Sequence, residues 1–211
     1  MAITPRTQNI TKVFRSATAA EVAEARDWYR RARALAESLA AEYGGPGAEH
    51  DETEVERAAA VIAVLSPRLS WPKNVELARL AYEWHADGSQ QLSNWPGLKG
   101  NALKAFQILG GATPDDVVKG PKVRTFWLTI CDPTDPRAVV VDRHAFDVAV
   151  NKVLTDETRG KLLGRKGAYD EVATMYRRAA KVLGGITPAE VQAVTWTVWR
   201  RTRAAANHGE A

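Results

Sequence analysis

The chain has 211 residues, of which 45% are hydrophobic and 26% charged, a composition typical of a soluble globular protein. Its single cysteine, Cys131, excludes an internal disulfide framework and any zinc site or iron–sulfur cluster that several thiolates of this chain would hold. The net charge of +4 is compatible with a polyanionic partner.

The first part of the chain predicts a tail followed by a long helix. Residues 1–15 are expected to form the N-terminal tail. Thr18, with Glu21 three positions later, is a capping-box pattern. The stretch behind it is rich in Ala, Glu, Arg and Leu, and it predicts a helix that ends at the glycines 44–45.

The rest of the chain also predicts helices. A second capping box, Thr53 with Glu56, precedes small apolar residues at helical spacing. Residues 138–141 are too short and isolated to imply a sheet, so the predicted class is all-α, and the polar segment 155–167 is expected to be a linker. Apolar periodicity and Gly or Pro stops predict helices over residues 53–65, 72–87, 101–109, 114–118, 122–130, 142–154 and 169–183, and from 188 onward.

The central stretch carries the residues suited to chemistry. The turn Gly120-Pro121 precedes Lys122, which begins one helix. The extended run 138–141 leads to Asp142, which begins another helix. An amine and a carboxylate that each begin a helix are expected to face one cleft, formed near residues 120–145.

Two segments of this stretch resemble a known family. GPKV at residues 120–123 and VVVDRHAF at 139–146 resemble the helix-hairpin-helix (HhH-GPD) DNA glycosylase superfamily, nearest to its 8-oxoguanine glycosylase and endonuclease III branches. In those branches a hairpin lysine is followed about twenty residues later by an aspartate in a V-D-x-H context, and Lys122 and Asp142 are twenty positions apart. Further matching segments, in the same order, are residues 63–74, 97–111 and 191–196, so that the resemblance covers about residues 55–200.

The resemblance implies a fold, a partner and an activity. The implied fold is an all-α, two-lobed helix-hairpin-helix DNA glycosylase-like fold, with residues 16–211 as a single domain and the N-terminal helix packed back on the C-terminal lobe. The implied partner is DNA, and the implied reaction is excision of a modified base after base flipping. AP-lyase activity is a further option for the same site.

Asp142 is the candidate that stabilises charge. Cleavage of an N-glycosidic bond develops positive charge on the sugar, which a nearby carboxylate stabilises. A helix N-terminus keeps such a carboxylate ionised. The alternative is an ordinary N-cap, because Asp is among the preferred capping residues, and the two roles are compatible.

Lys122 is the candidate nucleophile. A neutral lysine amine attacks the sugar carbon and forms a Schiff base, which then permits strand cleavage. The alternative is a lysine that only grips a phosphate, which the neighbouring cations Lys119 and Arg124 also favour.

Other candidate residues belong to two groups. An arginine wedge at Arg68 would fill the gap left by an extruded base, against the alternative of an exposed loop arginine. The candidate DNA- and phosphate-binding residues are Lys119, Gly120, Arg124, Arg143, His144 and Arg68, and the candidate base pocket is Gln192, Trp196 and Ser66.

The hairpin departs from the family pattern. Where the family usually reads L-P-G-V-G-x-K, this chain reads D-V-V-K-G-P-K, so that Val118 replaces the first glycine and Pro121 removes one backbone N–H. This altered phosphate cradle keeps a second function open: a glycosylase-like transferase that modifies 5-hydroxymethylpyrimidine bases in place, as thought for phage-type DNA-hypermodification relatives. A third reading is a non-catalytic DNA-binding module.

The sequence also bounds cofactors and location. His50 and His85 show no metal-ligand spacing, so we expect no metal and no cofactor. No apolar run approaches the roughly 20 residues that span a bilayer, and we expect no membrane partner. The N-terminal segment lacks the apolar core of a signal peptide, so a cytoplasmic location is expected.

Overall fold

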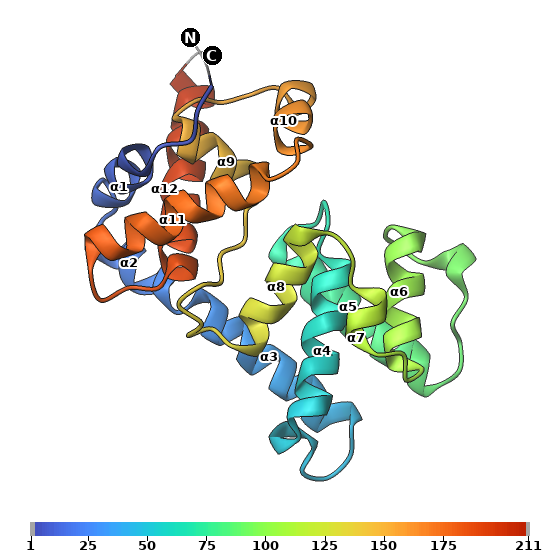
Figure 1. The fold of residues 1–211 in the computed structure, drawn as a ribbon. Coiled ribbons are helices and arrows are strands. Elements are labelled where there is room, and N and C mark those ends of the chain that lie inside the picture. The colour runs from blue at the N-terminus through green and yellow to red at the C-terminus, as the bar shows by residue number, and fades with distance from the viewer. Residues whose placement is uncertain (1–2, 210–211) are drawn as a thin grey trace. The chain divides into compact units, whose positions relative to one another are not determined.

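The computed structural model describes the backbone of residues 3–209 and the side chains of residues 3–203. The described residues are all-α and contain no strand, which confirms the predicted class (Figure 1). Among these residues, no helix is both long and apolar enough to cross a membrane. The helices are α1 Thr7–Arg15, α2 Ala19–Arg26, α3 Trp28–Tyr43, η1 Ala48–His50, α4 Glu52–Leu65, α5 Trp71–Ala86, η2 Leu92–Asn94, α6 Lys99–Leu109, α7 Pro114–Val117, α8 Pro121–Cys131, α9 Arg143–Val150, α10 Asp156–Leu163, α11 Ala168–Leu183 and α12 Pro188–Gly209.

The chain divides into two compact units. One unit, here called the discontinuous unit, consists of residues 1–29 and 133–211; the other, the inserted unit, is residues 30–132. In the discontinuous unit, α1 and α2 pack with α9, α11 and α12. The N-terminal helices therefore pack with the C-terminal ones, as predicted. In the inserted unit, the buried helix α4 packs against α5, α6 and α8.

The predicted N-terminal tail is wrong for residues 7–15, which form a helix, and residues 1–2 lie outside the described residues. Residues 7–15 form α1, whose Ile10 is fully buried in the core of the discontinuous unit. The backbone N–H of Arg6 and the side-chain amide of Asn9 both donate to the carbonyl oxygen of Ala149, at 2.9 and 2.8 Å. These bonds satisfy a carbonyl near the end of α9, which a helix terminus otherwise leaves unpaired.

The capping predictions hold at Thr18 and shift at Thr53. Thr18 and Glu21 form the predicted capping box, with bonds of 2.8 and 3.2 Å between each side chain and the other's N–H. The helix behind it is broken at Asp27 into α2 and α3. At the second site Asp51, not Thr53, is the N-cap, because its carboxylate accepts the Thr53 N–H at 2.9 Å.

The predicted linker over residues 155–167 is also wrong, because most of it is the helix α10. Arg159 of α10 is 6% exposed, and its guanidinium forms a bidentate ion pair with the fully buried Asp147 of α9, at 3.0 and 2.9 Å. A third bond of 2.6 Å runs to the carbonyl of Leu154. α9 ends at Val150, earlier than predicted, since Asn151 takes the left-handed conformation with φ of 50°.

This ion pair gives a prediction about stability. Asp147→Ala leaves the Arg159 guanidinium buried without its main counter-charge, and we expect a loss of about 3–5 kcal/mol in the free energy of unfolding. Urea unfolding followed by circular dichroism measures it. Asp156→Ala is the control, because Asp156 also pairs with Arg159 but its side chain is 89% exposed, and its loss should stay below about 1 kcal/mol. Equal effects of the two substitutions would contradict the role given to Asp147.

Candidate nucleic-acid interface

The hairpin of the inserted unit consists of α7, residues 118–120 and α8. Gly120 precedes α8 with φ of 85° and ψ of 138°, a conformation that only glycine adopts without strain. Val118 is 1% exposed, so its side chain anchors the hairpin in the core. The glycosylase hairpin pattern L-P-G-V-G-x-K has a glycine at this position. Trp127 of α8 is also buried, and its indole N–H donates to the carbonyl of Glu56 in α4 at 3.2 Å.

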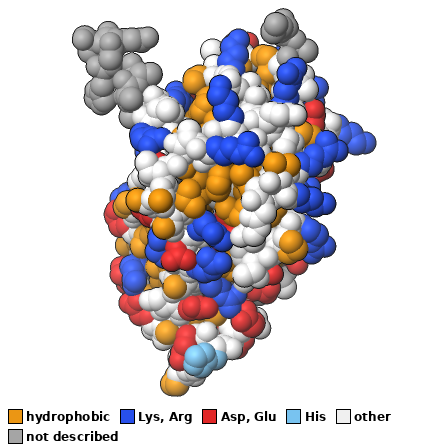
Figure 2. Space-filling model, turned by 90° about the vertical axis from the view of Figure 1, so that its left-hand side faces the viewer, with side chains coloured by type: hydrophobic (Ala, Val, Ile, Leu, Met, Phe, Trp, Pro, Cys, Tyr) orange, Lys and Arg blue, Asp and Glu red, His pale blue; other side chains and the backbone are white. Residues whose placement is uncertain are grey.

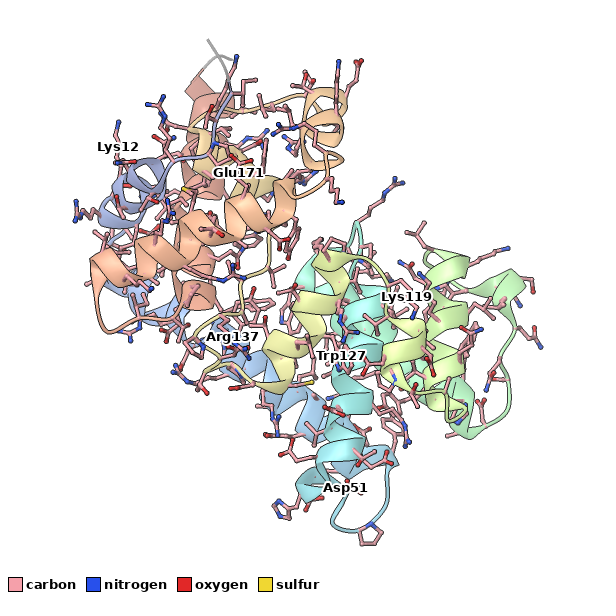
Figure 3. The ribbon with its side chains drawn as sticks, viewed as in Figure 1. Lys12, Asp51, Lys119, Trp127, Arg137 and Glu171 are labelled. Carbon is pink, nitrogen blue, oxygen red and sulfur yellow. The ribbon has the colours of Figure 1, made fainter. Side chains whose placement is uncertain are left out.

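The cations of this hairpin differ in how they are engaged. Lys119 donates to the Asp115 carbonyl at 2.8 Å. Arg124 pairs with the Asp115 carboxylate, and its guanidinium lies 5.5 Å from the centre of the ring of Trp127, which Figure 3 labels. Lys122 is half-buried, and no described residue of the inserted unit forms a hydrogen bond or ion pair with its ammonium group. Lys122 is therefore the hairpin cation that its own unit leaves available.

Arg68 lies in a turn that follows α4. The turn is closed by a bond of 3.2 Å from the Leu69 N–H to the Ser66 carbonyl, and Arg68 at its tip has φ of 67°. A left-handed conformation is uncommon for a residue other than glycine and marks local strain. The Arg68 side chain is exposed, and the described residues of the inserted unit give it no partner. The Ser66 hydroxyl, in contrast, donates to the Ala63 carbonyl at 2.9 Å.

Asp142 begins α9 in the discontinuous unit. Its carboxylate accepts the Ala145 N–H at 2.7 Å, as an N-cap does, and the residue is half-buried. Its charge acts on two buried phenols. Burial, and after it the Asp142 charge, raise the pKa of Tyr29 well above its usual value, and both effects also raise the pKa of Tyr176. Both phenols therefore remain neutral beside the carboxylate.

His144 follows Asp142 by two residues and is 8% exposed. Its Nε2 accepts the Arg143 Nε–H at 3.3 Å, which makes Nδ1 the protonated nitrogen. That buried Nδ1 has no hydrogen-bond partner among the described residues. Burial is the main cause that lowers the His144 pKa; Arg143 and Arg203 lower it further, and Asp142 opposes them. The ring is thus a neutral donor at pH 7.

Trp196 and Arg200 of α12 lie beside this histidine. The rings of His144 and Trp196 meet edge to face with centres 6.2 Å apart. The Arg200 guanidinium covers the Trp196 ring at 4.6 Å. No carboxylate among the described residues pairs with Arg143, Arg200 or Arg203. These three arginines and His144 form a cluster, here called the α9–α12 cluster, whose positive charge suits an anionic group.

Gln192 belongs to an internal network. It is 6% exposed, and its amide oxygen accepts the Tyr29 hydroxyl at 2.8 Å. Its backbone carbonyl accepts the hydroxyl of Thr195 at 3.1 Å, and Thr195 in turn lies 3.3 Å from the Tyr176 hydroxyl. The amide oxygen of Gln192 is therefore used inside the unit.

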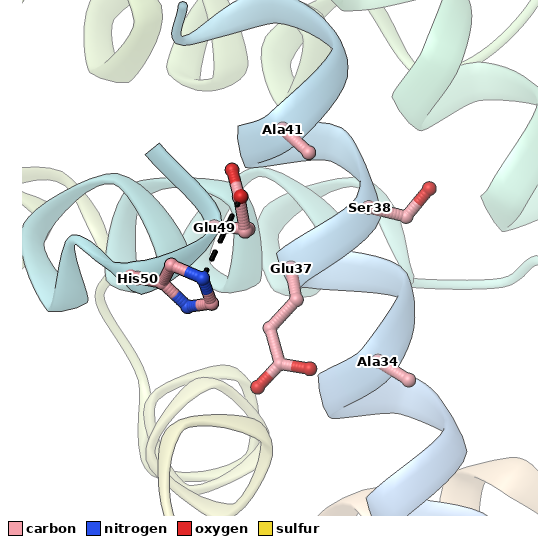
Figure 4. A pocket seen from close by; sticks show the side chains of 6 residues that line it. All are labelled: Ala34, Glu37, Ser38, Ala41, Glu49 and His50. Atoms are coloured by element: carbon pink, nitrogen blue, oxygen red, sulfur yellow. Dashed lines mark ion pairs between the residues drawn. The ribbon is translucent and has the colours of Figure 1, made fainter. Parts of the chain in front are cut away.

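A shallow pocket of about 470 Å³ lies elsewhere in the inserted unit, along α3 and η1 (Figure 4). The carboxylates of Glu37 and Glu49 line it, and Glu49 lies 3.6 Å from His50 Nε2. Two carboxylates disfavour a polyanion at this place. In the described part of the chain, no three His, Cys, Asp or Glu side chains are grouped so as to hold a metal ion.

The two units differ in charge. The discontinuous unit contains 17 Lys and Arg against 12 Asp and Glu, whereas the inserted unit contains 12 against 13. Figure 2 shows Lys and Arg side chains spread over one face of the molecule, with Asp and Glu among them. Exposed cations of α1 and α11 are Lys12, Arg15, Arg178 and Lys181.

The predicted residues thus fall into two sets. The inserted unit holds Ser66, Arg68, Lys119, Gly120, Lys122 and Arg124, and the discontinuous unit holds Asp142, Arg143, His144, Gln192 and Trp196. In the discontinuous unit the structure brings His144 and Trp196 together, whereas Ser66 and Arg68 show only local contacts, and the cleft shared by Lys122 and Asp142 stays a prediction. The sequence interpretation missed Arg200, although its spacing of four from Trp196 on one helix gives a signal.

Comparison with known proteins gives one match. A model described as "Family of unknown function (DUF7178)" matches residues 2–203. Neither the curated proteins nor the solved structures include a match to the chain.

Proposed function

The chain belongs to the family of unknown function DUF7178, and we propose that it is a DNA glycosylase, which extrudes a modified base from DNA and releases it. The observation that carries the proposal is the segment Val141-Asp142-Arg143-His144. Its carboxylate is fixed at a helix start, and its histidine is a buried donor next to arginines that no carboxylate of the described residues pairs with. The division of the chain into two helical units, one of which joins N-terminal to C-terminal helices, supports a two-lobed glycosylase-like fold.

In this reaction Asp142 stabilises the positive charge that develops on the sugar. Departure of the base leaves positive charge on the deoxyribose, and a carboxylate already held in place needs no reorganisation to oppose it. The bond to the Ala145 N–H supplies that fixation. Because Asp142 is only half-buried, part of the residue is accessible from solvent.

Lys122 supplies the lyase step. Its neutral amine attacks C1′ of the sugar; the base leaves with the bonding electrons and takes up the proton that the attacking amine loses. The ring-opened imine that results permits elimination of the 3′ phosphate. The absence of a partner for Lys122 within its unit supports this role, because no ion pair has to be broken first.

The α9–α12 cluster is the proposed phosphate site. The His144 Nδ1–H and the Arg143 and Arg200 guanidinium groups are donors suited to phosphate oxygens. At the hairpin, Asp115 offsets the Arg124 charge, so the discontinuous unit contributes most of the affinity for DNA. Arg68, strained and exposed, is the proposed wedge that replaces the extruded base.

One observation favours a second candidate, the glycosylase-like transferase that modifies 5-hydroxymethylpyrimidine bases in place. Val118 is buried in the hairpin, and Pro121 offers no N–H at the start of α8. A hairpin with fewer free N–H groups holds a phosphate less firmly. In this respect the hairpin departs from that of the helix-hairpin-helix DNA glycosylases, which excise bases. The presence of both Lys122 and Asp142 argues against the third candidate, a binding module without catalysis.

The carboxylate gives the first test. Asp142→Asn keeps the N-cap, because Asn caps helices about as well as Asp, so folding should be unchanged. The charge is lost, and single-turnover base release should fall by about 100-fold or more. Asp135→Asn, a loop carboxylate paired with Arg137, is the control and should release the base at the wild-type rate. A fully active Asp142→Asn protein would leave Asp142 as a helix cap only.

The amine gives the second test. Borohydride should trap the wild-type protein covalently on DNA with an abasic site, because reduction locks the imine between Lys122 and the opened sugar. Lys122→Gln should abolish trapping and keep most of the DNA affinity, since one cationic contact of several is lost. Lys119→Gln is the matched control and should be trapped normally. A wild-type protein that is not trapped even at an abasic site does not use Lys122 as a nucleophile.

The phosphate site gives the third test. Arg200→Gln should weaken DNA binding and lower the slope of log affinity against log salt concentration by about 1, as expected for the loss of one phosphate contact. Fluorescence anisotropy over a salt series measures both. Arg79→Gln removes an arginine that pairs with Glu42 and should leave the slope unchanged. Equal slopes for wild type and Arg200→Gln would exclude a phosphate at this position.

A further inference from the structure

The extended segment that leads to Asp142 has no neighbouring strand. Val139 is 1% exposed and Val141 is 2% exposed, yet no described residue forms a strand beside them. Buried backbone N–H and C=O groups need hydrogen-bond partners, because an unpaired one is unfavourable. Something other than a sheet must therefore hold this segment.

A single tyrosine of α11 meets this need. The Tyr169 hydroxyl accepts the Val141 N–H at 3.0 Å and donates to the Val139 carbonyl at 3.3 Å. In a β-ladder, the N–H and C=O groups of a neighbouring strand make these two bonds. The Tyr169 hydroxyl thus replaces the missing strand directly before Asp142.

A second tyrosine of the same helix holds the chain after Asp142. Tyr176 is fully buried, and its hydroxyl lies 3.3 Å from the Ala145 carbonyl, to which it donates. Ala145 is also the residue whose N–H binds the Asp142 carboxylate at 2.7 Å. Tyr169 and Tyr176 are seven positions apart, so they project from one face of α11. The same helix contacts the segment once more, where Arg177 Nε donates to the Arg137 carbonyl at 2.8 Å.

We propose that Tyr169 and Tyr176 form a clamp that fixes the main chain on both sides of Asp142, and that Tyr169 is a positioning residue for its carboxylate. Neither tyrosine has to touch DNA for this role. A carboxylate that acts on developing charge must be held within a fraction of an ångström, and a displacement of about 1 Å lowers a rate by about 100-fold. The catalytic half of this inference rests on the proposed glycosylase function, whereas the structural half does not.

Tyr169→Phe tests the clamp, because it removes one oxygen atom and keeps the ring. We expect the Val141 amide to exchange with deuterium at least about 10-fold faster, since its acceptor is gone. Base release should fall by about 10- to 100-fold in kcat, with little change in KM, because no DNA contact is lost. Tyr43→Phe, at a tyrosine that stacks on Tyr82 in the inserted unit, is the control and should change neither quantity.

The outcomes separate the two claims. An unchanged exchange rate at Val141 in Tyr169→Phe overturns the clamp, whatever the activity. Faster exchange with an unchanged rate of base release overturns the positioning role. A wild-type protein that releases no base overturns the proposed function, while the exchange rate still decides the clamp. Should Tyr169→Phe fail to fold, Arg177→Gln takes its place, with faster exchange in residues 137–141 and slower base release as the result that supports the clamp.

Discussion

The hydrogen bond from the Ala145 N–H to the Asp142 carboxylate is the contact on which the candidate site depends. It caps α9, and it fixes the direction of the only acidic side chain in the Val141–His144 segment. The contact needs a main chain that is held on both sides. Because none of the described residues forms a strand beside the segment, α11 supplies the partners through two tyrosine hydroxyls. Stability and proposed catalysis therefore depend on the same few bonds, and substitutions in this region have to be tested for both.

The charges within each unit are compatible with the proposed DNA partner. The discontinuous unit carries the excess of Lys and Arg, and in the α9–α12 cluster no carboxylate among the described residues pairs with the arginines. At the hairpin, Asp115 accepts a hydrogen bond from Lys119 through its carbonyl and pairs with Arg124 through its carboxylate. No described residue of the inserted unit, in contrast, pairs with Lys122. A lysine without an ion pair in its unit is suited both to phosphate binding and to nucleophilic attack.

Local signals in the sequence were sufficient for most helices and for the position of Asp142 as an N-cap. These signals are Gly and Pro stops, the Thr18 capping box and apolar spacing. Each is a property of a few neighbouring residues, so it can be recognised without knowledge of the fold. The prediction failed where long-range contacts decide the structure. The sequence of α10 is polar and therefore predicts a linker, but its Arg159 is buried in an ion pair with Asp147, 12 positions away. The sequence of α1 predicts a tail, but its Ile10 packs in the core. Tyr169 binds backbone groups 28 and 30 positions away, and no spacing rule finds such a contact. For the same reason, the cleft shared by Lys122 and Asp142 remains a prediction.

The central claim, that the chain releases a modified base from DNA, is tested most directly with the wild-type protein. Duplexes that each carry one modified base, including oxidised purines and 5-hydroxymethylpyrimidines, are incubated with the protein, and both strands are weighed by mass spectrometry. We predict that at least one modified strand loses the mass of its base, with or without cleavage of the strand. A gain of mass on an intact 5-hydroxymethylpyrimidine strand, or no change in any duplex, would contradict the claim.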